Sequence, residues 1–260
     1  MKVSIVTITF NAARTLQRTL DSVACQTYAD IEHLIIDGAS KDGTLQIAEH
    51  YQQQSRHMVV IQSEPDRGLY DAMNKGLQKA TGDYLVFLNA GDTLYAPDTI
   101  EVVMKAPQLP SRQERTEAAV IYGDTAITDA EGRFLHLRRH RPPERLTWKS
   151  FKQGMLVCHQ AFYVRTDIAR SIPYDLQYRH SADVDWCIRV MREADRQHLS
   201  LINSHAILAN FEEGGDTTQH HRDSLKERFK IMMHHYGLVQ TVVMHAWFVL
   251  RSLLRAGTQA

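Results

Sequence analysis

The chain has 260 residues, of which 43% are hydrophobic and 23% charged, which is enough for one large buried core or two smaller ones. Its 30 basic and 30 acidic side chains cancel, which argues against wholesale binding of nucleic acid. The three cysteines are far apart and form no Cys-x-x-Cys pair, which favours a reduced, cytoplasmic protein. No apolar run is long enough to cross a bilayer, and no cleavage site for a secretory signal follows the first strand.

The first ninety residues alternate between strand and helix patterns. The predicted strands are 3–10, 33–36, 58–62 and 84–88, and the predicted helices start at Ala12 and span 44–51 and 70–80. Strands that alternate with helices in this way predict a parallel sheet with helices on both faces.

The remainder of the chain has a less regular pattern. The polar segment 107–117, with two prolines, predicts a loop. Further predicted strands are 120–127, 134–138 and 159–164, and further predicted helices are 183–194 and 225–236, the last stopped by Gly237. No flexible linker separates the two parts of the chain.

Polar and acidic residues follow each of the first four predicted strands, at 9–11, 37–44, 64–68 and 89–92. Ligands of open α/β sheets bind beyond the carboxyl ends of the strands, so we expect these groups to converge on one edge. The glycine-rich phosphate loops of dehydrogenases and P-loop proteins are missing from the sequence.

Three aspartates each allow a structural and a functional interpretation. Asp37 either forms an Asx turn or accepts N–H bonds from a nucleobase. Asp92 either ends a tight turn or binds a divalent cation whose other ligands come from a diphosphate. Asp183, near the start of a helix, either stabilises the first turn by about 1 kcal/mol or acts as a general base.

Taken together, several segments resemble the inverting glycosyltransferases of family 2, which have the GT-A fold. The similarity covers about residues 2–217, and within the family it is greatest to enzymes of bacterial exopolysaccharide, capsule or O-antigen assembly, including the colanic-acid type. The segments are SIVTITFNA (4–12), IIDGASKDGT (35–44), EPDRGLYDAMNKGLQKATGDYLVFLNAGD (64–92), CHQAFYVR (158–165), SADVDW (181–186) and FEEGGDT (211–217).

The resemblance implies an α/β fold of the Rossmann-like GT-A type, with a mixed, mainly parallel sheet flanked by helices and a C-terminal helical extension. It divides the chain into a catalytic domain at 1–217 and the extension at 218–260. Within the catalytic domain, residues 1–100 would bind the nucleotide and residues 101–217 the acceptor.

The resemblance also implies a role for individual residues. Asp183 would be the catalytic base, and Asp92 would bind Mg²⁺ or Mn²⁺ at the end of a DXD-like motif that includes Asn89 and Gly91. His159 and Gln160 would border the donor sugar or the acceptor. The remaining donor-binding residues would be Thr9, Phe10 and Asn11 in the nucleotide pocket, Asp37 on the base, Asp66 and Arg67 near the base and ribose, and Asp71 and Lys75 towards the sugar diphosphate.

The sequence departs from the family pattern in two places. Asn89 and Gly91 stand where the family often has aspartate, and Ala182 replaces the glutamate that usually precedes the base. Asp185 either compensates for that glutamate, or the site needs one carboxylate only.

The implied reaction is a single displacement by a hexosyltransferase. We expect the acceptor to be a saccharide or lipid-linked saccharide of the cell surface. Its hydroxyl attacks the anomeric carbon of a nucleotide-diphosphate sugar, while Asp183 removes the proton of that hydroxyl. A cation at Asp92 neutralises the charge of the departing diphosphate. The implied partners therefore include no nucleic acid.

Two other functional classes remain open. A nucleotidyltransferase shares the strand–helix layout, but its usual glycine- and basic-rich first loop is absent from TFNAARTL. A non-catalytic module that binds nucleotide-sugars is favoured by Ala182, Asn89 and Gly91.

Two further segments have no assigned role. The basic run 136–146 is either a solvated loop or a contact for anionic lipid. The segment from Leu238 to Leu254 is an amphipathic helix that lies on the inner face of the membrane, covers the core or forms a homodimer. We accordingly expect a cytoplasmic protein for which peripheral membrane attachment is an open alternative.

Overall fold

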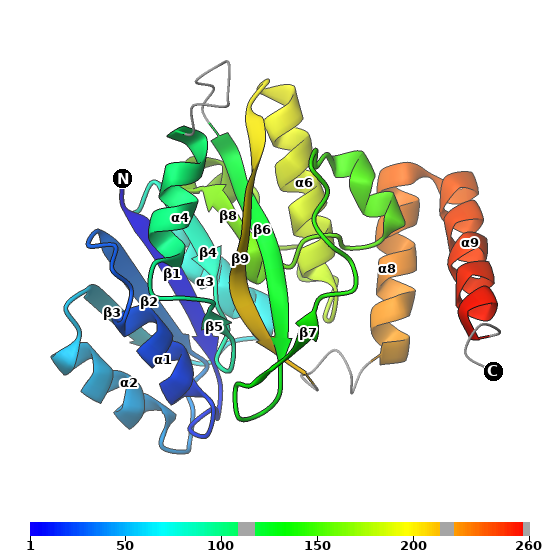
Figure 1. The fold of residues 1–260 in the computed structure, drawn as a ribbon. Helices are drawn as coiled ribbons and strands as arrows, with labels where there is room; N and C mark the ends of the chain where they lie inside the picture. The colour runs from blue at the N-terminus through cyan, green and yellow to red at the C-terminus, as the bar shows by residue number, and fades with distance from the viewer. Residues whose placement is uncertain (109–117, 214–220, 257–260) are drawn as a thin grey trace.

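The chain folds into one mixed sheet with helices on both faces (Figure 1). The structure, a computed structural model, describes residues 1–108, 118–213 and 221–256, without the side chains of 221 and 249–256. The sheet has nine strands in the order β3-β2-β1-β4-β8-β6-β9-β5, and β7 pairs with β6 off this path. The predicted α/β class is therefore confirmed.

The first half of the sheet is parallel throughout. Its central strand, β1, pairs with β2 on one side and β4 on the other, and β2 pairs with β3. The registers align Thr9 with Asp37 and Val6 with Phe87, so that the carboxyl ends of these strands form a common edge. The strands are β1 (Val3–Thr9), β2 (Ile31–Asp37), β3 (Met58–Ser63) and β4 (Tyr84–Phe87).

Helices α1 (Leu16–Ala24) and α2 (Thr44–Gln54) cover one face of this half, and α3 (Leu69–Lys79) covers the other. Ile35 of β2 packs with Leu16 and Leu20 of α1 on the first face. On the second face, a Cβ at Gly76 would lie 2.4 Å from a methyl carbon of Val6. The glycine therefore lets α3 pack directly against β1.

The second half of the sheet combines parallel and antiparallel pairs. β8 is antiparallel to both β4 and β6, β9 is parallel to β6, and β5 is antiparallel to β9. The strand predicted at 159–164 begins as the 3₁₀ turn η3 (His159–Ala161) and becomes a strand only afterwards. The strands are β5 (Thr93–Leu94), β6 (Ala118–Thr128), β7 (Phe134–Leu137), β8 (Phe162–Arg165) and β9 (Ser200–Glu212).

The long strand β9 has no counterpart among the sequence predictions. Its polar residues break the apolar alternation, and its pairing with β6 shifts register between Tyr122 and Asp124. His205 has a φ of 56°, and a Cβ at Gly123 would lie 2.5 Å from the carbonyl oxygen of Ala206. The two strands thus approach each other closely at a bulge that an alternating pattern does not reveal.

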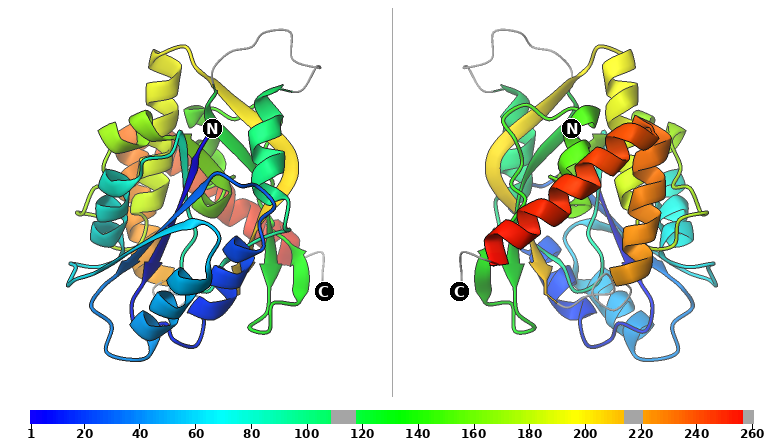
Figure 2. Two further views of the ribbon diagram at one scale, coloured as in Figure 1. Left: turned by 90° about the vertical axis from the view of Figure 1, so that its left-hand side faces the viewer. Right: turned by 90° about the vertical axis from the view of Figure 1, so that its right-hand side faces the viewer.

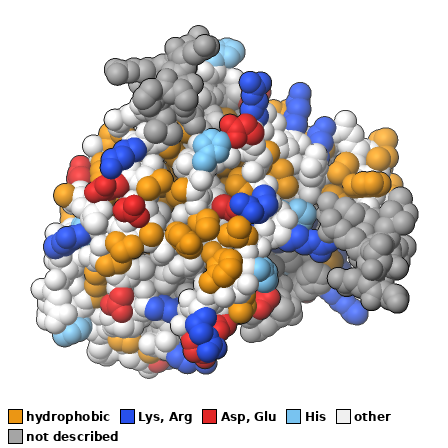
Figure 3. Space-filling view, viewed as in Figure 1, with side chains coloured by type: hydrophobic (Ala, Val, Ile, Leu, Met, Phe, Trp, Pro, Cys, Tyr) orange, Lys and Arg blue, Asp and Glu red, His pale blue; other side chains and the backbone are white. Residues whose placement is uncertain are grey.

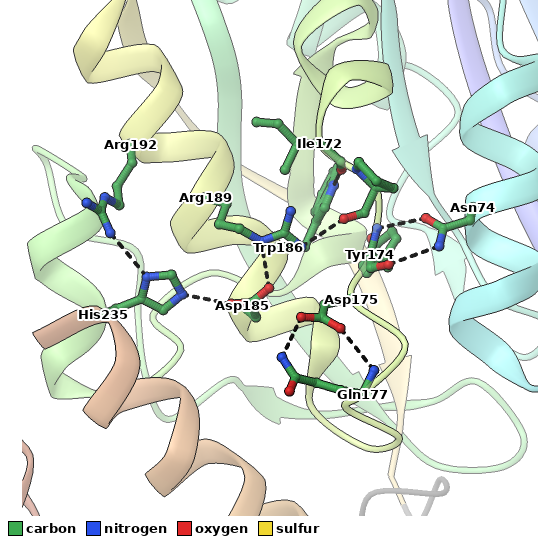
Figure 4. A network of polar contacts seen from close by, with 11 residues as sticks. Asn74, Ile172, Tyr174, Asp175, Gln177, Asp185, Trp186, Arg189, Arg192 and His235 are labelled. Atoms are coloured by element: carbon green, nitrogen blue, oxygen red, sulfur yellow. Dashed lines mark hydrogen bonds and ion pairs between the residues drawn. The ribbon is translucent and has the colours of Figure 1, made fainter.

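An aromatic cluster fixes the helices behind the second half of the sheet. The rings of Tyr174 and Trp186 stack with centroids 4.9 Å apart, and the indole N–H donates to the carbonyl of Ile172 at 2.7 Å (Figure 4). The side chain of Asn74 in α3 ties down the backbone of Tyr174. The helices are α4 (Thr99–Lys105), η1 (Ala106–Gln108), η2 (Trp148–Gln153), α5 (Thr166–Ser171) and α6 (Ala182–Arg196).

The last two helices, α8 (His221–Tyr236) and α9 (Leu238–Ala256), form a hairpin at the end of the molecule away from α1 and α2 (Figures 1 and 2). Gly237 joins them with a φ of 81°, a value that favours glycine. Within the described ranges, no helix has both the length and the apolarity of a bilayer span. Figure 3 shows basic and acidic side chains interspersed on one face, in keeping with the balanced charge.

Candidate active site

The parallel half of the sheet presents Asp37 at the end of β2. This carboxylate is 1% exposed and accepts hydrogen bonds from the backbone N–H of Ser40 at 3.0 Å and from the hydroxyl of Ser63 at 2.6 Å. The Ser40 hydroxyl donates to it as well. Asp37 therefore fixes the segment after β2, although through the N–H of the third residue on and not of the second, as an Asx turn would. Binding of a nucleobase stays a prediction for this fixed carboxylate.

The residues around Asp37 combine an exposed ring with polar groups. Phe10 is 64% exposed, and the buried hydroxyl oxygen of Thr9 has no hydrogen-bond partner. Asn11 adopts a φ of 48° and accepts from the Lys41 N–H at 2.9 Å, which orders the loop after β1. A stacking surface beside an unpaired hydroxyl suits a planar ligand with polar edges.

Gly38 and Asp66 meet at this same edge. A Cβ at position 38 would lie 2.5 Å from Oδ2 of Asp66, whose other carboxylate oxygen, Oδ1, accepts the N–H of Gly68 at 2.8 Å. The loop after β3 therefore closes over the loop after β2 because residue 38 has no side chain.

The three other predicted donor-binding residues hold the loop between β3 and α3. Arg67 and Asp71 form an ion pair of 2.8 Å on the surface. Lys75 binds the Glu64 carboxylate and the Pro65 carbonyl, each at 2.8 Å. These ion pairs and hydrogen bonds do not reach Asp92, and the role of the three residues towards a diphosphate remains a prediction.

Asp92 lies in the tight turn after β4 and is 6% exposed. Gln160 donates to its carboxylate at 2.7 Å, and the Thr19 hydroxyl links its carbonyl to the N–H of Gly91. Burial raises the pKa of Asp92 to about 6, against the opposing effects of the Gln160 hydrogen bond and the positive charges nearby. A buried carboxylate of this kind gains from a cation that replaces its lost hydration.

Asp183 lies in the first turn of α6, whose N-cap is Ser181. Its two carboxylate oxygens face the Tyr70 hydroxyl at 3.3 Å and Nδ1 of His159 at 3.4 Å. Burial opposes ionisation, but the hydrogen bond and charge of His159 and the charge of Arg228 outweigh it, so the pKa of Asp183 is lowered. The carboxylate is therefore ionised at neutral pH and able to accept a proton.

Two consecutive residues of η3 connect the carboxylates. His159 contacts Asp183 through Nδ1 and the Asn89 amide through Nε2, the latter at 3.4 Å, while Gln160 binds Asp92. Nδ1 of His159 faces the Asp183 carboxylate and can donate a hydrogen bond to it. The structure thus brings together five of the predicted site residues.

The residues present fit a divalent cation that arrives with a diphosphate. Among the residues the structure describes, no three His, Cys, Asp or Glu side chains cluster as a complete metal site. The Asn89 amide oxygen is buried without a hydrogen-bond partner, and it lies in the same turn as the Asp92 carboxylate. Oxygen donors are the ligands of Mg²⁺ and Mn²⁺, and a bound diphosphate would complete the set.

Asp185 does not join the site. One of its oxygens binds Arg189 and the other binds His235 of α8, each at 2.7 Å (Figure 4). The residue is 3% exposed. Residues two apart on a helix point in directions about 200° apart, so Asp185 faces away from Asp183. Of the two alternatives for the missing glutamate, the geometry favours a single carboxylate on α6.

Sequence reasoning assigned no role to three residues that contact or influence the two carboxylates. Tyr70 donates to Asp183, and burial followed by the charge of Asp183 raises the pKa of its phenol well above the ordinary value. Arg228 acts on Asp183 from α8, and Thr19 holds the Asp92 turn from α1. Their only sequence signal is the position of Tyr70 inside the segment 64–92.

A cavity of about 700 Å³ lies at the opposite end of the sheet, beside Gly82, Asp83 and Arg165. None of the predicted site residues lines it. It is therefore separate from the candidate active site at the carboxyl edge.

Comparisons with known proteins agree with this geometry. The model of the family "Glycosyl transferase family 2" matches residues 4–172. A relative from Mycobacterium bovis (strain BCG), named PGL/p-HBAD biosynthesis glycosyltransferase, is 35% identical over 213 residues, which cover 82% of this chain and 77% of the relative.

Solved structures share the fold at low sequence identity. S. aureus TarS superposes with a TM-score of 0.68 at 16% identity, over 96% of this chain but only 43% of the TarS chain. The mannosyltransferase PcManGT from Pyrobaculum calidifontis, solved with GDP-Man and Mn²⁺, gives a TM-score of 0.61 at 15% identity, over 99% and 79% of the two chains. These matches confirm the GT-A-type α/β fold. By its sequence and its fold, the chain is a glycosyltransferase that belongs to glycosyl transferase family 2.

Proposed function

We propose that the protein transfers a sugar from a nucleotide-diphosphate sugar to an acceptor hydroxyl with inversion at the anomeric carbon. The observation that carries this proposal is the η3 link, in which His159 contacts Asp183 and the adjacent Gln160 contacts Asp92. The pKa of Asp183 is lowered and that of Asp92 is raised, and shifted pKa values of this kind are common at functional sites. Homologous structures support a nucleotide-sugar donor, since TarS is solved with UDP-GlcNAc and PcManGT with GDP-Man.

In this mechanism Asp183 removes the proton of the acceptor hydroxyl as its oxygen bonds to the anomeric carbon. The bond from that carbon to the diphosphate oxygen breaks, and its electron pair leaves with the nucleoside diphosphate. Tyr70 and His159 orient the Asp183 carboxylate through their hydrogen bonds. Mg²⁺ or Mn²⁺, held by Asp92 and Asn89, would supply electrostatic stabilisation of the leaving diphosphate.

The donor is identified by a panel of nucleotide-sugars. We expect one donor to raise the melting temperature of the protein, because a ligand that binds only the folded state stabilises it. With that donor and Mn²⁺, nucleoside diphosphate is released, and EDTA suppresses the release. Nuclear magnetic resonance of the transferred sugar reports the anomeric configuration, and retention would contradict the single displacement.

The same assay separates the two alternative classes. A nucleotidyltransferase releases no nucleoside diphosphate in this assay, but it forms a nucleotide-sugar and pyrophosphate when a sugar 1-phosphate and a nucleoside triphosphate are supplied instead. A non-catalytic module gives the thermal shift without release of either product.

The acceptor we propose is a saccharide, in lipid-linked form, of cell-surface polysaccharide or glycolipid assembly. The relative named for PGL/p-HBAD biosynthesis supports an acceptor with a lipid portion. The C-terminal hairpin supports it further, since α9 contains no acidic residue and Lys149 and Lys152 lie on the adjacent η2. Exposed apolar side chains on α9 are Leu238, Val239, Val242, Val243 and Trp247. This helix would attach the protein peripherally to an anionic membrane face.

The basic run 136–146 contributes less to such attachment. Its Arg141 pairs with the buried carboxylate of Asp124, which favours a structural role for that arginine.

A further inference from the structure

The carboxylate of Glu227 in α8 accepts three consecutive backbone N–H groups. These are the amides of Arg179 at 2.8 Å, His180 at 2.8 Å and Ser181 at 3.0 Å. The two segments are separated by 46 to 48 residues, so the contact is tertiary and not a local turn. One side chain therefore fixes the backbone of a whole turn.

This turn leads directly into the helix that bears the candidate base. Ser181 is the N-cap of α6, but its side chain makes no capping bond to its own helix. Its hydroxyl instead pairs with that of Ser224 in α8 at 2.9 Å. The beginning of α6 is accordingly held from α8, and Asp183 follows two residues later. Helices without a capping side chain fray at the first turn unless another group satisfies the amides.

The same helix also acts on the charge of Asp183. Arg228, next to Glu227 in the chain, contributes to the lowered pKa of the Asp183 carboxylate. Ile231 and Met232 pack into the core, so α8 is anchored independently of the polar contacts. Helix α8 thus fixes the turn before α6 and also favours the ionised form of Asp183. Precise positioning of a catalytic group depends on supporting contacts of this kind.

We propose that Glu227 is a positioning residue of the transfer reaction, which sets the first turn of α6 and thereby the place of the Asp183 carboxylate. The inference rests on the proposed role of Asp183 as the base.

The test compares Glu227→Gln with wild type. The amide keeps the size of the side chain, but its NH₂ group cannot accept the backbone N–H groups. We expect kcat for transfer to fall about 100-fold, as misplacement of a reacting group by about 1 Å commonly causes, while the KM and Kd for the donor change less than about twofold. Hydrogen exchange at the amides of 179–181 accelerates in the same variant.

Two further variants make the result specific. Glu227→Asp retains the carboxylate and restores part of kcat. Glu49→Gln, at an exposed position on α2, leaves kcat and exchange at 179–181 at wild-type values. The melting temperature of each variant is measured beside its kinetics, because a simple loss of folded protein lowers the amount of active enzyme without changing its KM.

Unchanged kcat in Glu227→Gln, with faster exchange at 179–181, would overturn the proposal. A parallel loss of donor affinity and melting temperature would overturn it too, since it indicates a general structural role. If wild type transfers no sugar from any donor, the proposed function itself fails. Hydrogen exchange then still shows whether Glu227 holds the turn, so that the two failures are distinguished.

Discussion

The two halves of the sheet hold their carboxylates at the same edge through different kinds of contact. In the first half, Asp37 is held by Ser63, the last residue of β3, and by Ser40, three residues after β2, and the parallel register brings these strand ends together. Where the first half meets the second, Asp92 and Asp183 are held by Gln160, His159 and Tyr70, which lie far away in the chain. The first arrangement fixes a carboxylate through adjacent strand ends, while the second holds two carboxylates with shifted pKa values through long-range contacts.

The strongest test of this contrast is Asp183→Asn. The amide cannot accept a proton from the acceptor, so we expect kcat to fall by about 10² to 10⁴, the usual contribution of a general base. Binding of the nucleoside diphosphate, measured by calorimetry, stays near the wild-type value because the first half is untouched. Wild-type turnover in this variant removes Asp183 from the mechanism.

The raised pKa of Asp92 predicts a dependence of stability on pH. Because the folded-state pKa of about 6 exceeds the ordinary 3.8, the stabilising effect of the protonated form is complete below pH 3.8 and is lost as pH rises through 6. Over this interval wild type should lose up to about 3 kcal/mol of unfolding free energy that Asp92→Asn does not lose. Urea unfolding of both proteins at pH 4 and pH 7 measures the difference.

Parallel pH curves for the two proteins would show that Asp92 titrates normally. A cation added with nucleoside diphosphate at pH 7 should restore stability to wild type more than to Asp92→Asn.

Gly38→Ala sharpens the contrast within the first half. A Cβ there would lie 2.5 Å from the Asp66 carboxylate, which must move, and 3.2 Å from the exposed Phe10 ring, which must also shift. We expect donor affinity to weaken about tenfold, which corresponds to about 1.4 kcal/mol, with a melting temperature within a few degrees of wild type. Calorimetry with the donor and thermal unfolding measure the two effects. A large loss of stability with intact affinity would contradict a binding role for this edge.

The smallest expected effect concerns α9. Val243→Asp adds a charge to its exposed apolar face and should reduce flotation with anionic vesicles by a few-fold, since each buried apolar group contributes modestly to interfacial binding. Met58→Asp in β3, at a side chain exposed to a similar degree, is the matched control. Equal flotation of both variants and wild type excludes α9 as the attachment surface.

Sequence patterns predicted the first half well because its elements repeat a regular period. Apolar runs ending in Asp37 and Asn89 located the strand ends, and parallel topology placed those ends together. Strand β9 was not predicted because the bulge at His205, which lies against Gly123 of β6, breaks the alternation of apolar and polar residues. Prediction therefore succeeded where local pattern and fold coincide.

The contacts of the candidate site depend on tertiary structure and could not be found this way. The pairing of Gln160 with Asp92 joins residues 68 positions apart, and that of Tyr70 with Asp183 joins residues 113 apart. Asp185 and its partner His235 in α8 are 50 positions apart. A single sequence reports residue types at these positions but not which of them meet.

The dependence of Asp183 on α8 has a consequence for synthesis of the protein on the ribosome. Residues 1–92, which include Asp37 and Asp92, are translated more than a hundred residues before Glu227 and Arg228. The contacts from α8 to the start of α6 can therefore form only after this first part of the chain has emerged. Asp183 accordingly reaches its final position only once α8 has been synthesised.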